Sequence, residues 1–185
     1  MKVTGIICSP RKNGNSEVLV REILKSGGFE DVEMFYANEM HIMGCQACYY
    51  CDEHGECAVQ DDMQKIYEAI EKADVVAFGA PVYMFGLTGQ FKLVLDRLFA
   101  FLGPAPEFKS RLPVGKKAVL VVPQGYEDSR EYETHIDQMK NAIATVGFEE
   151  VKVLSAPGLN APGEASTRPD LMEEAKKIGQ SLSHA

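Results

Sequence analysis

Short apolar runs alternate along this chain with segments in which hydrophobic residues recur at helical spacing. The apolar runs are rich in β-branched residues, as buried strands are, and cover residues 3–7, 32–36, 73–80, 118–122 and 148–154. Helical spacing marks residues 16–24, 63–72, 88–102 and 130–146, and a closing helix is expected to be capped by Thr167. Strands that alternate with helices build a parallel sheet covered on both faces. The pattern therefore predicts an α/β, doubly wound fold whose five-stranded parallel sheet has the order 2-1-3-4-5.

One connection is longer than such a fold requires. Residues 37–60 join the second predicted strand to the next helix, and a loop of that length in a compact domain is usually functional. Asp61 and Asp62, which follow it, are predicted to cap the helix over residues 63–72. The chain has 185 residues, of which 45% are hydrophobic, and this suffices for one sizeable core. We therefore expect a single domain over residues 1–185 with an insertion at residues 37–60.

The net charge limits the classes of partner. A charge of −8 and a pI near 5.1 argue against nucleic acid and anionic membranes, since both require a basic protein surface. The longest apolar stretch, residues 75–87, contains a proline and is shorter than the ~20 residues of a membrane helix. Residues 1–10 do not have the pattern of a signal peptide. We therefore expect a soluble cytoplasmic protein without nucleic-acid or membrane partners.

The segment Cys8–Ser16 joins the first predicted strand to the first predicted helix. It is short and polar, carries two positive charges and no acidic residue, and ends at the helix N-terminus, where Ser16 is predicted to be the cap. A helix start offers unpaired N–H groups and the positive end of the helix dipole. The segment is therefore predicted to bind an anionic group such as a nucleotide phosphate.

Known motifs narrow the choice of anion. The segment contains neither G-x-x-x-x-G-K-[ST] nor G-x-G-x-x-G, which argues against a nucleoside-triphosphate loop and a dinucleotide fold. In a Cys-x5-Arg phosphatase loop starting at Cys8, the arginine would stand where Gly14 is. The pattern Ser-Pro-Arg-x-x-Gly-Asn-Ser resembles the FMN phosphate loop of the flavodoxin-like NAD(P)H-dependent FMN reductases and iron–sulfur flavoproteins. By this resemblance, the residues implied to hold the FMN phosphate are Ser9, Arg11, Asn13, Asn15 and Ser16.

The carboxyl end of the third predicted strand leads into a turn that is dense in aromatic and thioether side chains. Ligands of open α/β sheets bind beyond the carboxyl ends of strands, and a flat ring such as isoalloxazine fits an aromatic turn. Pro-Val-Tyr, the following Thr-Gly-Gln-x-Lys, and Leu-Asp-Arg ending at Arg97 resemble the flavin loop and next helix of the same reductases. The residues expected at the flavin are Pro81, Val82, Tyr83, Met84, Phe85 and Gly86, with Gln124 and Gly125 in the turn over residues 123–126.

Cysteines dominate the insertion, where four of the five in the chain follow the spacing C-x2-C-x2-C-x5-C. Three thiolates separated by two residues can surround one face of a cubane, and a fourth can close it. The motif resembles that of the iron–sulfur flavoproteins, which implies a [4Fe-4S] cluster bound by Cys45, Cys48, Cys51 and Cys57. Zinc stays open, since a tetrahedral site accepts four thiolates or three with His54, and so do unligated or oxidised thiols. The other histidines, His41, His135 and His184, are expected at the surface.

These features favour an FMN-dependent oxidoreductase of the iron–sulfur flavoprotein kind. It would pass electrons between a donor, NAD(P)H or ferredoxin, a [4Fe-4S] cluster and FMN, and no acid or base catalyst is predicted. The alternative is an NAD(P)H-dependent FMN or quinone reductase whose cysteines bind zinc or stay unligated, and a redox or metal sensor is a third hypothesis. The helix over residues 88–102 carries more apolar surface than one core face needs, so we expect a homodimer or homotetramer. The loop over residues 156–163 is expected to be a lid, a subunit contact or a plain connector.

Overall fold

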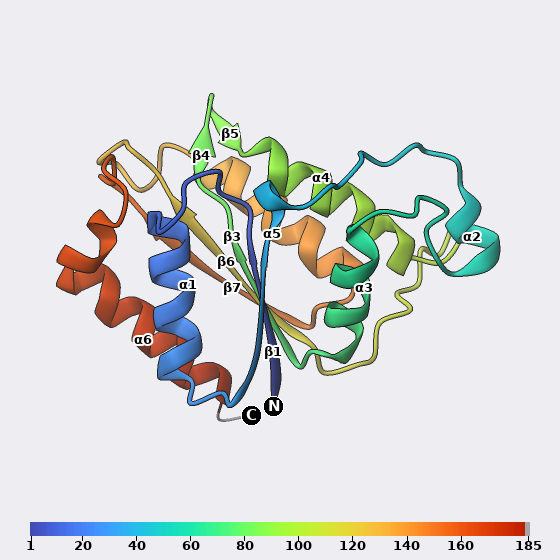
Figure 1. The fold of residues 1–185 in the computed structure, drawn as a ribbon, viewed down its shortest axis with the longest axis horizontal. Coiled ribbons are helices and arrows are strands. Elements are labelled where there is room, and N and C mark those ends of the chain that lie inside the picture. Colours follow the sequence, from blue (N-terminus) through green and yellow to red (C-terminus); the bar gives the residue numbers. More distant parts are fainter. Residues whose placement is uncertain (184–185) are drawn as a thin grey trace.

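The computed structural model describes residues 1–183, and a five-stranded parallel sheet lies at its centre (Figure 1). The strands are β1 (Lys2–Ile7), β2 (Asp31–Tyr36), β3 (Val75–Gly79), β6 (Lys117–Pro123) and β7 (Glu150–Ala156). Their order is β2-β1-β3-β6-β7, and each neighbouring pair is parallel. This confirms the predicted fold and the order 2-1-3-4-5, because β6 and β7 are the fourth and fifth strands of the sheet. His184 lies outside the described residues.

Helices cover both faces of the sheet (Figure 1). One face carries α1 (Asn15–Ser26) and α6 (Pro169–Ser183), and the other carries α3 (Met63–Lys72), α4 (Gly89–Arg97) and α5 (Glu133–Val146). Successive strand residues point to opposite faces, so in β3 Val76 and Phe78 join one apolar core while Val75 and Ala77 join the other. Burial on both faces explains why these strands are continuous apolar runs in the sequence.

The starts of two helices differ from the predicted caps. Helix α1 begins after Gly14, so Ser16 lies inside its first turn and is not the cap. Asp62 precedes α3 but makes no side-chain capping bond, whereas Asp61 Oδ1 accepts a hydrogen bond from the Met63 N–H at 3.0 Å. The capping prediction therefore holds for Asp61 and is wrong for Ser16 and Asp62.

Other boundaries shift by a few residues. The predicted helix over residues 88–102 is α4 followed by the 3-10 helix η2 (Leu98–Phe101). Thr167 ends the 3-10 helix η3 (Glu164–Thr167), and α6 begins at Pro169, so the predicted cap at Thr167 is wrong. Within residues 1–183, no helix has both the length and the apolar character needed to traverse a lipid bilayer.

Two irregular segments project from this frame. The connection after β2 contains the 3-10 helix η1 (Ala37–Glu39) and the short helix α2 (Tyr50–His54), which lies at the far right in Figure 1. The turn after β3 forms a small antiparallel hairpin of β4 (Val82–Tyr83) and β5 (Gly86–Leu87). Its two tip residues, Met84 and Phe85, have φ of 45° and 64°. Bulky residues rarely adopt this left-handed conformation, so the tip is a strained part of the backbone.

Candidate functional site

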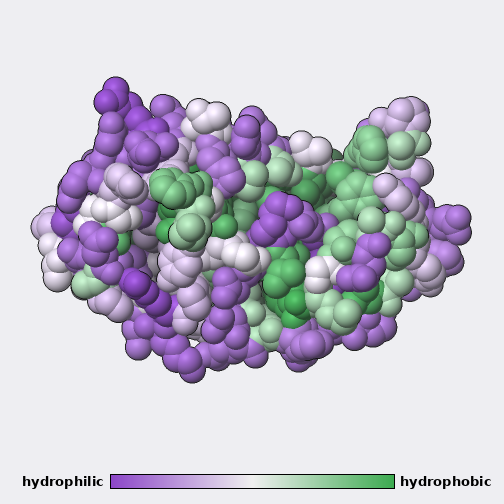
Figure 2. Space-filling model, turned by 90° about the horizontal axis from the view of Figure 1, so that it is seen from above, coloured by the Kyte–Doolittle hydropathy of each residue, from purple (hydrophilic) through white to green (hydrophobic). Residues whose placement is uncertain are grey.

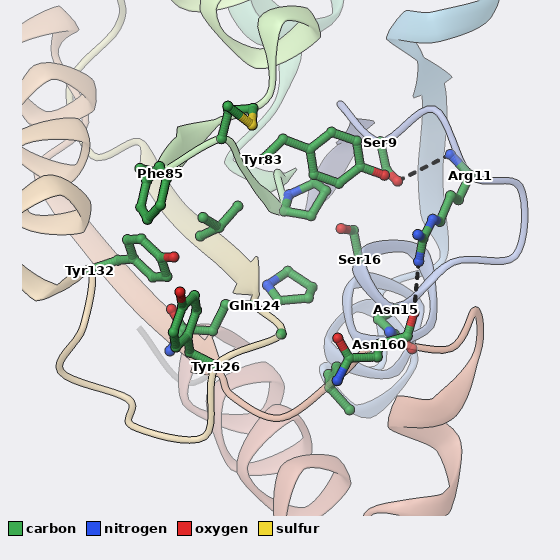
Figure 3. A pocket seen from close by; sticks show the side chains of 16 residues that line it. Ser9, Arg11, Asn15, Ser16, Tyr83, Phe85, Gln124, Tyr126, Tyr132 and Asn160 are labelled. Carbon is green, nitrogen blue, oxygen red and sulfur yellow. Dashed lines mark hydrogen bonds between the residues drawn. The ribbon is translucent and has the colours of Figure 1, made fainter.

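A cavity of about 500 Å³ opens at the carboxyl ends of β1, β3 and β6 (Figure 3). Its walls come from the loop after β1, the β4-β5 hairpin, the turn after β6 and the loop after β7. The predicted flavin residues that line it are Ser9, Arg11, Asn15, Ser16, Pro81, Val82, Tyr83, Met84, Phe85, Gln124 and Gly125. Asn13 and Gly86 lie outside the lining. The fold thus gathers loops that are far apart in the sequence around one space.

The loop after β1 presents hydrogen-bond donors to this cavity. Ser16 is 1% exposed, and its Oγ has no hydrogen-bond partner. The Arg11 guanidinium donates to the Asn160 carbonyl at 2.8 Å, and the Arg11 backbone N–H donates to Ser9 Oγ at 3.2 Å (Figure 3). A buried polar group without a partner costs about 1–3 kcal/mol. An anion that accepted a hydrogen bond from the Ser16 hydroxyl would therefore stabilise the folded chain.

Asn13 and Asn15 bond mainly to the protein itself. The Asn13 N–H donates to Glu17 Oε2 at 3.0 Å, in a left-handed conformation with φ of 52° that asparagine tolerates. Asn15 Nδ2 donates to the Ala161 carbonyl at 2.9 Å, and Asn15 Oδ1 accepts from the Ala165 N–H at 3.0 Å. The Asn15 side chain therefore ties the loop after β7 to the start of α1, and its backbone N–H, at the helix start, is left for a ligand.

Glu17 is a buried carboxylate that fixes the backbone of the same loop. It is 6% exposed, and its Oε1 accepts hydrogen bonds from Arg21 Nε at 2.9 Å and from the Tyr36 hydroxyl at 2.8 Å. Burial opposes ionisation of this carboxyl, but the hydrogen bonds from Arg21, Tyr36 and Asn13 outweigh it and lower its pKa below 4.5. The ionised Glu17 carboxylate thus fixes the loop after β1 without lining the cavity.

The opposite wall of the cavity is aromatic (Figure 3). Tyr126 and Tyr132 meet edge to face with ring centroids 5.8 Å apart, close to Phe85 of the hairpin. Met84 and Phe85 are 91% and 67% exposed, which is unusual for side chains of this size. The cavity therefore has a polar, cationic end at Arg11 and an apolar end at the hairpin.

The turn after β6 completes the wall. Gln124 is buried, and its Nε2 donates to the Asp128 carbonyl at 3.0 Å while its Oε1 has no partner. A Cβ on Gly125 would stand 2.7 Å from Asn160 Oδ1, so this turn lies close to the Asn160 side chain of the loop after β7.

Gly86 does not line the cavity, and a Cβ on it would stand 3.6 Å from His135 Nε2. The N–H of its neighbour Leu87 donates to His135 Nε2 at 3.3 Å, and His135 is half-buried against the hairpin. The expectation of a surface position is confirmed for His41, which is exposed, while His135 lies partly exposed beside the hairpin.

A second cavity, of about 260 Å³, lies within the connection after β2 and is lined by all four cysteines of the motif. Tyr49, Phe99 and Arg97 are among the other lining residues. The four thiols are free, and burial together with the Asp52 carboxylate raises the pKa of Cys51. In the described part of the chain, no three His, Cys, Asp or Glu side chains lie close enough together to hold a metal ion. The thiols thus surround a common space without converging on one point.

His54 does not share this cavity. Its ring stacks on Tyr50 with centroids 3.8 Å apart, and its Nδ1 lies 3.0 Å from the Tyr50 carbonyl oxygen. His54 is exposed and absent from the lining, which contains the four cysteines and one carboxylate, Asp96, that pairs with Lys92.

A sequence profile of the NADPH-dependent FMN reductases matches residues 1–154. The chain belongs to this family. An iron-sulfur flavoprotein of Methanosarcina thermophila is 41% identical over 100 residues, which cover 52% of this chain and 52% of that protein. Another, from Archaeoglobus fulgidus, is 30% identical over 191 residues, which cover 100% of this chain and 80% of that protein. The chain thus spans about half the length of the first relative and most of the second.

Solved structures agree with the fold. An NAD(P)H:quinone oxidoreductase from Methanothermobacter marburgensis superposes with a TM-score of 0.73 at 22% identity, over 100% of this chain and 98% of that chain. An FMN-dependent NADH-azoreductase from Bacillus anthracis, solved in complex with FMN, gives a TM-score of 0.74 at 13% identity over 100% of both chains. At these identities the likeness concerns the architecture.

Five cavity residues of this FMN reductase family member are not among the residues predicted to bind the flavin. They are Pro123, Tyr126, Tyr132, Leu159 and Asn160. Pro123 and Tyr126 flank the predicted Gln124–Gly125 pair, so the turn itself indicates them. Leu159 and Asn160 belong to the Pro/Gly-marked loop over residues 156–163, which the structure places at the cavity. Tyr132 precedes α5 and reaches the cavity only through the fold.

Proposed function

We propose that this protein is an FMN-dependent oxidoreductase that passes electrons between NAD(P)H or ferredoxin, a [4Fe-4S] cluster and FMN. The observation that carries the proposal is the buried, unpartnered Ser16 hydroxyl in a cavity whose far wall is aromatic (Figure 3). A phosphate oxygen would satisfy the hydroxyl, and an isoalloxazine ring would cover the aromatic wall. Family membership supports FMN, and the names of the relatives support the cluster.

The polar end of the cavity fits a phosphate. The first N–H groups of α1 have no partner within the helix, so those of Asn15 and Ser16 are available together with the hydroxyls of Ser16 and Ser9. Arg11 supplies the positive charge, and the Asn160 carbonyl orients its guanidinium. Asn13 would contribute by keeping the loop in its left-handed turn, since its N–H is bound by Glu17.

The apolar end fits the flavin ring. Pro81, Val82 and the hairpin side chains would shield the ring from water, and the unpartnered Gln124 Oε1 offers an acceptor for a ring N–H. When bound, FMN takes up a hydride as two electrons and can release them singly. Arg11 is the charged residue in the lining, which contains no carboxylate or imidazole. The chain would therefore orient FMN and exclude water, with no acid or base of its own at the ring.

The cysteine cavity fits a sulfur-bound cluster. Cys45, Cys48, Cys51 and Cys57 line the same space, His54 does not, and the Asp96 carboxylate in the lining pairs with Lys92. Four thiolates are therefore the ligand set that we propose. A [4Fe-4S] cluster transfers one electron at a time, which complements the two-electron chemistry of nicotinamide donors. Cluster ligands must be reduced thiolates, which a reducing compartment preserves, and we assign the protein to the cytoplasm on this ground.

Cofactor content after purification without oxygen tests the proposal. We expect bound FMN, with about four iron and four sulfide per chain. Cys51→Ser should lose iron and sulfide and keep FMN, and Cys8→Ala is the matched control because Cys8 is a buried thiol outside the cysteine cavity. A content of about one zinc per chain without sulfide would show that the cysteines bind zinc and would favour an FMN or quinone reductase without a cluster. Protein that binds neither FMN nor iron after reconstitution would refute the proposal.

Self-association is part of the same proposal. Apolar residues gather across the middle and right of the face seen from above, where Figure 1 places α4 and the cysteine-containing connection (Figure 2). Exposed Tyr49, Leu93 and Phe108 are large apolar side chains that a second copy would cover. We expect a homodimer or homotetramer by light scattering, and a monomer at micromolar concentration would contradict this.

A further inference from the structure

Arg97, at the end of α4, is the largest fully buried side chain of the described residues. A guanidinium cannot lose its charge in a protein, so its burial requires partners for every donor. Asp61 supplies a bidentate pair, with Arg97 Nη1 2.8 Å from Oδ2 and Nη2 3.2 Å from Oδ1. The two side chains are 0% and 1% exposed. Such a pair is geometrically specific, and breaking it would leave an uncompensated buried charge.

Other hydrogen bonds of the pair go to the two ends of the cysteine loop. Arg97 Nη1 donates to the Met43 carbonyl at 2.9 Å, and Nη2 donates to the Val59 carbonyl at 3.1 Å. The Met43 N–H donates in turn to Asp61 Oδ2 at 2.8 Å. Met43 stands two residues before Cys45, and Val59 two residues after Cys57. The ion pair therefore holds together the two ends of the loop that contains all four cysteines.

The orientation of Arg97 is fixed by one more side chain. Arg97 Nε donates to the Tyr67 hydroxyl at 3.2 Å, and that hydroxyl donates to the Arg97 carbonyl at 2.8 Å. Arg97 lines the cysteine cavity, whereas Asp61 does not. The positive partner of the pair thus borders the space between the thiols. The other charged residue of the lining, Asp96, is paired with Lys92.

We propose that Arg97 and Asp61 position the cysteine loop for its cluster, and that Arg97 supplies a fixed positive charge beside it. This inference rests on the proposed function. A cluster held by thiolates has a negative charge that increases on reduction, so a neighbouring cation favours the reduced state. An apolar pair of similar volume in place of Arg97 and Asp61 would fill the space, often without loss of stability. It would supply neither the hydrogen bonds to the ends of the cysteine loop nor the charge.

Four variants of the full chain test this inference. Arg97→Met removes the positive charge and the hydrogen bonds to the Met43 and Val59 carbonyls. Arg97→Lys keeps the charge but cannot reach both carbonyls, and Asp61→Asn removes the negative charge that pairs with Arg97. Lys116→Met is the matched control, because Lys116 is a buried cation that donates to the carbonyls of Glu71 and Ala73, outside both cavities. Each protein is reconstituted with iron and sulfide without oxygen and compared with the unaltered chain.

The readouts are iron retention against a chelator, the cluster midpoint potential and FMN content. Arg97→Met and Arg97→Lys should retain iron about 10- to 100-fold less strongly, as expected when a supporting partner of a metal ligand is lost. The potential should become more negative in Arg97→Met and stay near that of the unaltered chain in Arg97→Lys, because lysine keeps the positive charge. Asp61→Asn should weaken iron retention without lowering the potential. Lys116→Met should keep iron, potential and FMN.

The outcomes distinguish failure of the proposed cluster from failure of the positioning role. If the unaltered chain takes up no iron or sulfide, the proposed cluster is wrong, and the role of Arg97 falls with it. If the unaltered chain is loaded but the Arg97 variants retain iron equally well at an unchanged potential, the positioning role is wrong and the cluster stands. Equal loss of iron and FMN in Arg97→Met, or iron loss in Lys116→Met, would show a general folding defect and would also overturn the inference.

Discussion

Replacing Ser16 by alanine should change stability and FMN affinity in opposite directions. Without a ligand, the Ser16 hydroxyl is 1% exposed and has no partner, so the folded chain carries the desolvation cost of an unpaired polar group, about 1–3 kcal/mol. Alanine removes this cost and leaves a space no larger than one oxygen atom. The free energy of unfolding of ligand-free Ser16→Ala should therefore rise by about 1 kcal/mol or more.

Binding should respond with the other sign. In the FMN complex the hydroxyl would donate to a phosphate oxygen, and a hydrogen bond to a charged group contributes about 1.5–3 kcal/mol. Its loss corresponds to roughly 10- to 150-fold weaker FMN binding. The N–H groups at the start of α1 and the Arg11 guanidinium remain, so binding is weakened and not abolished.

Ser155 provides the matched control. Its Oγ is also buried without a partner, but it lies in β7 and does not line the cavity. Urea unfolding of the ligand-free proteins and quenching of FMN fluorescence measure the two quantities. Ser155→Ala should gain stability and bind FMN normally. Unchanged FMN affinity in Ser16→Ala would refute the assignment of this hydroxyl to the phosphate, and with it the main support for the FMN site.

Three further predictions concern the loops around the cavity. Replacing Met84-Phe85 by Asn-Gly, which suits a two-residue hairpin tip, should relieve about 1–2 kcal/mol of backbone strain per residue and so raise the melting temperature of the ligand-free chain. The same change should weaken FMN binding. A lower melting temperature would contradict the strain. The lowered pKa of Glu17 means that its ionised form stabilises the fold above pH 4.5 and that this contribution disappears as the pH falls through the folded pKa. Glu17→Gln should therefore lose less stability than the unaltered chain between about pH 6 and about pH 3 in urea unfolding, and equal losses would rule out this role. Gly125→Ala places a Cβ 2.7 Å from Asn160 Oδ1, which ends an exposed side chain that can turn aside, so it should change stability by less than about 1 kcal/mol. The added methyl group narrows the cavity and should weaken FMN binding, and normal FMN affinity would show that FMN does not contact this turn.

The sheet and the positions of the ligand loops could be predicted because they follow from local patterns. A strand buried on both faces, such as β3, is a continuous apolar run in any doubly wound fold, and its carboxyl end points to the ligand edge. The β4-β5 hairpin could not be predicted in this way. Its tip holds Met84 and Phe85 in left-handed conformations that the sequence usually signals with asparagine or glycine. The resemblance to a flavin loop located these residues, but their backbone required the structure.

The roles of single polar residues were the least predictable, because hydrogen-bond partners come from distant parts of the chain. Asp61, predicted as a helix cap, also pairs with Arg97 36 residues away. Asn15 and Ser16 are both polar residues at the start of α1, yet the Asn15 side chain is satisfied by the loop after β7, and the Ser16 hydroxyl is left unpaired.

Ligand contacts are therefore best assigned where two observations coincide, a buried polar atom without a partner and a place in the cavity lining. Ser16 and Gln124 meet both conditions, whereas Ser155 and Asp52 have unpaired buried oxygens away from either cavity lining. An unpaired atom that no ligand reaches is a cost to stability alone, so its removal should leave binding unchanged. The contrast between Ser16→Ala and Ser155→Ala thus tests the rule itself, because the rule fails if both variants bind FMN alike.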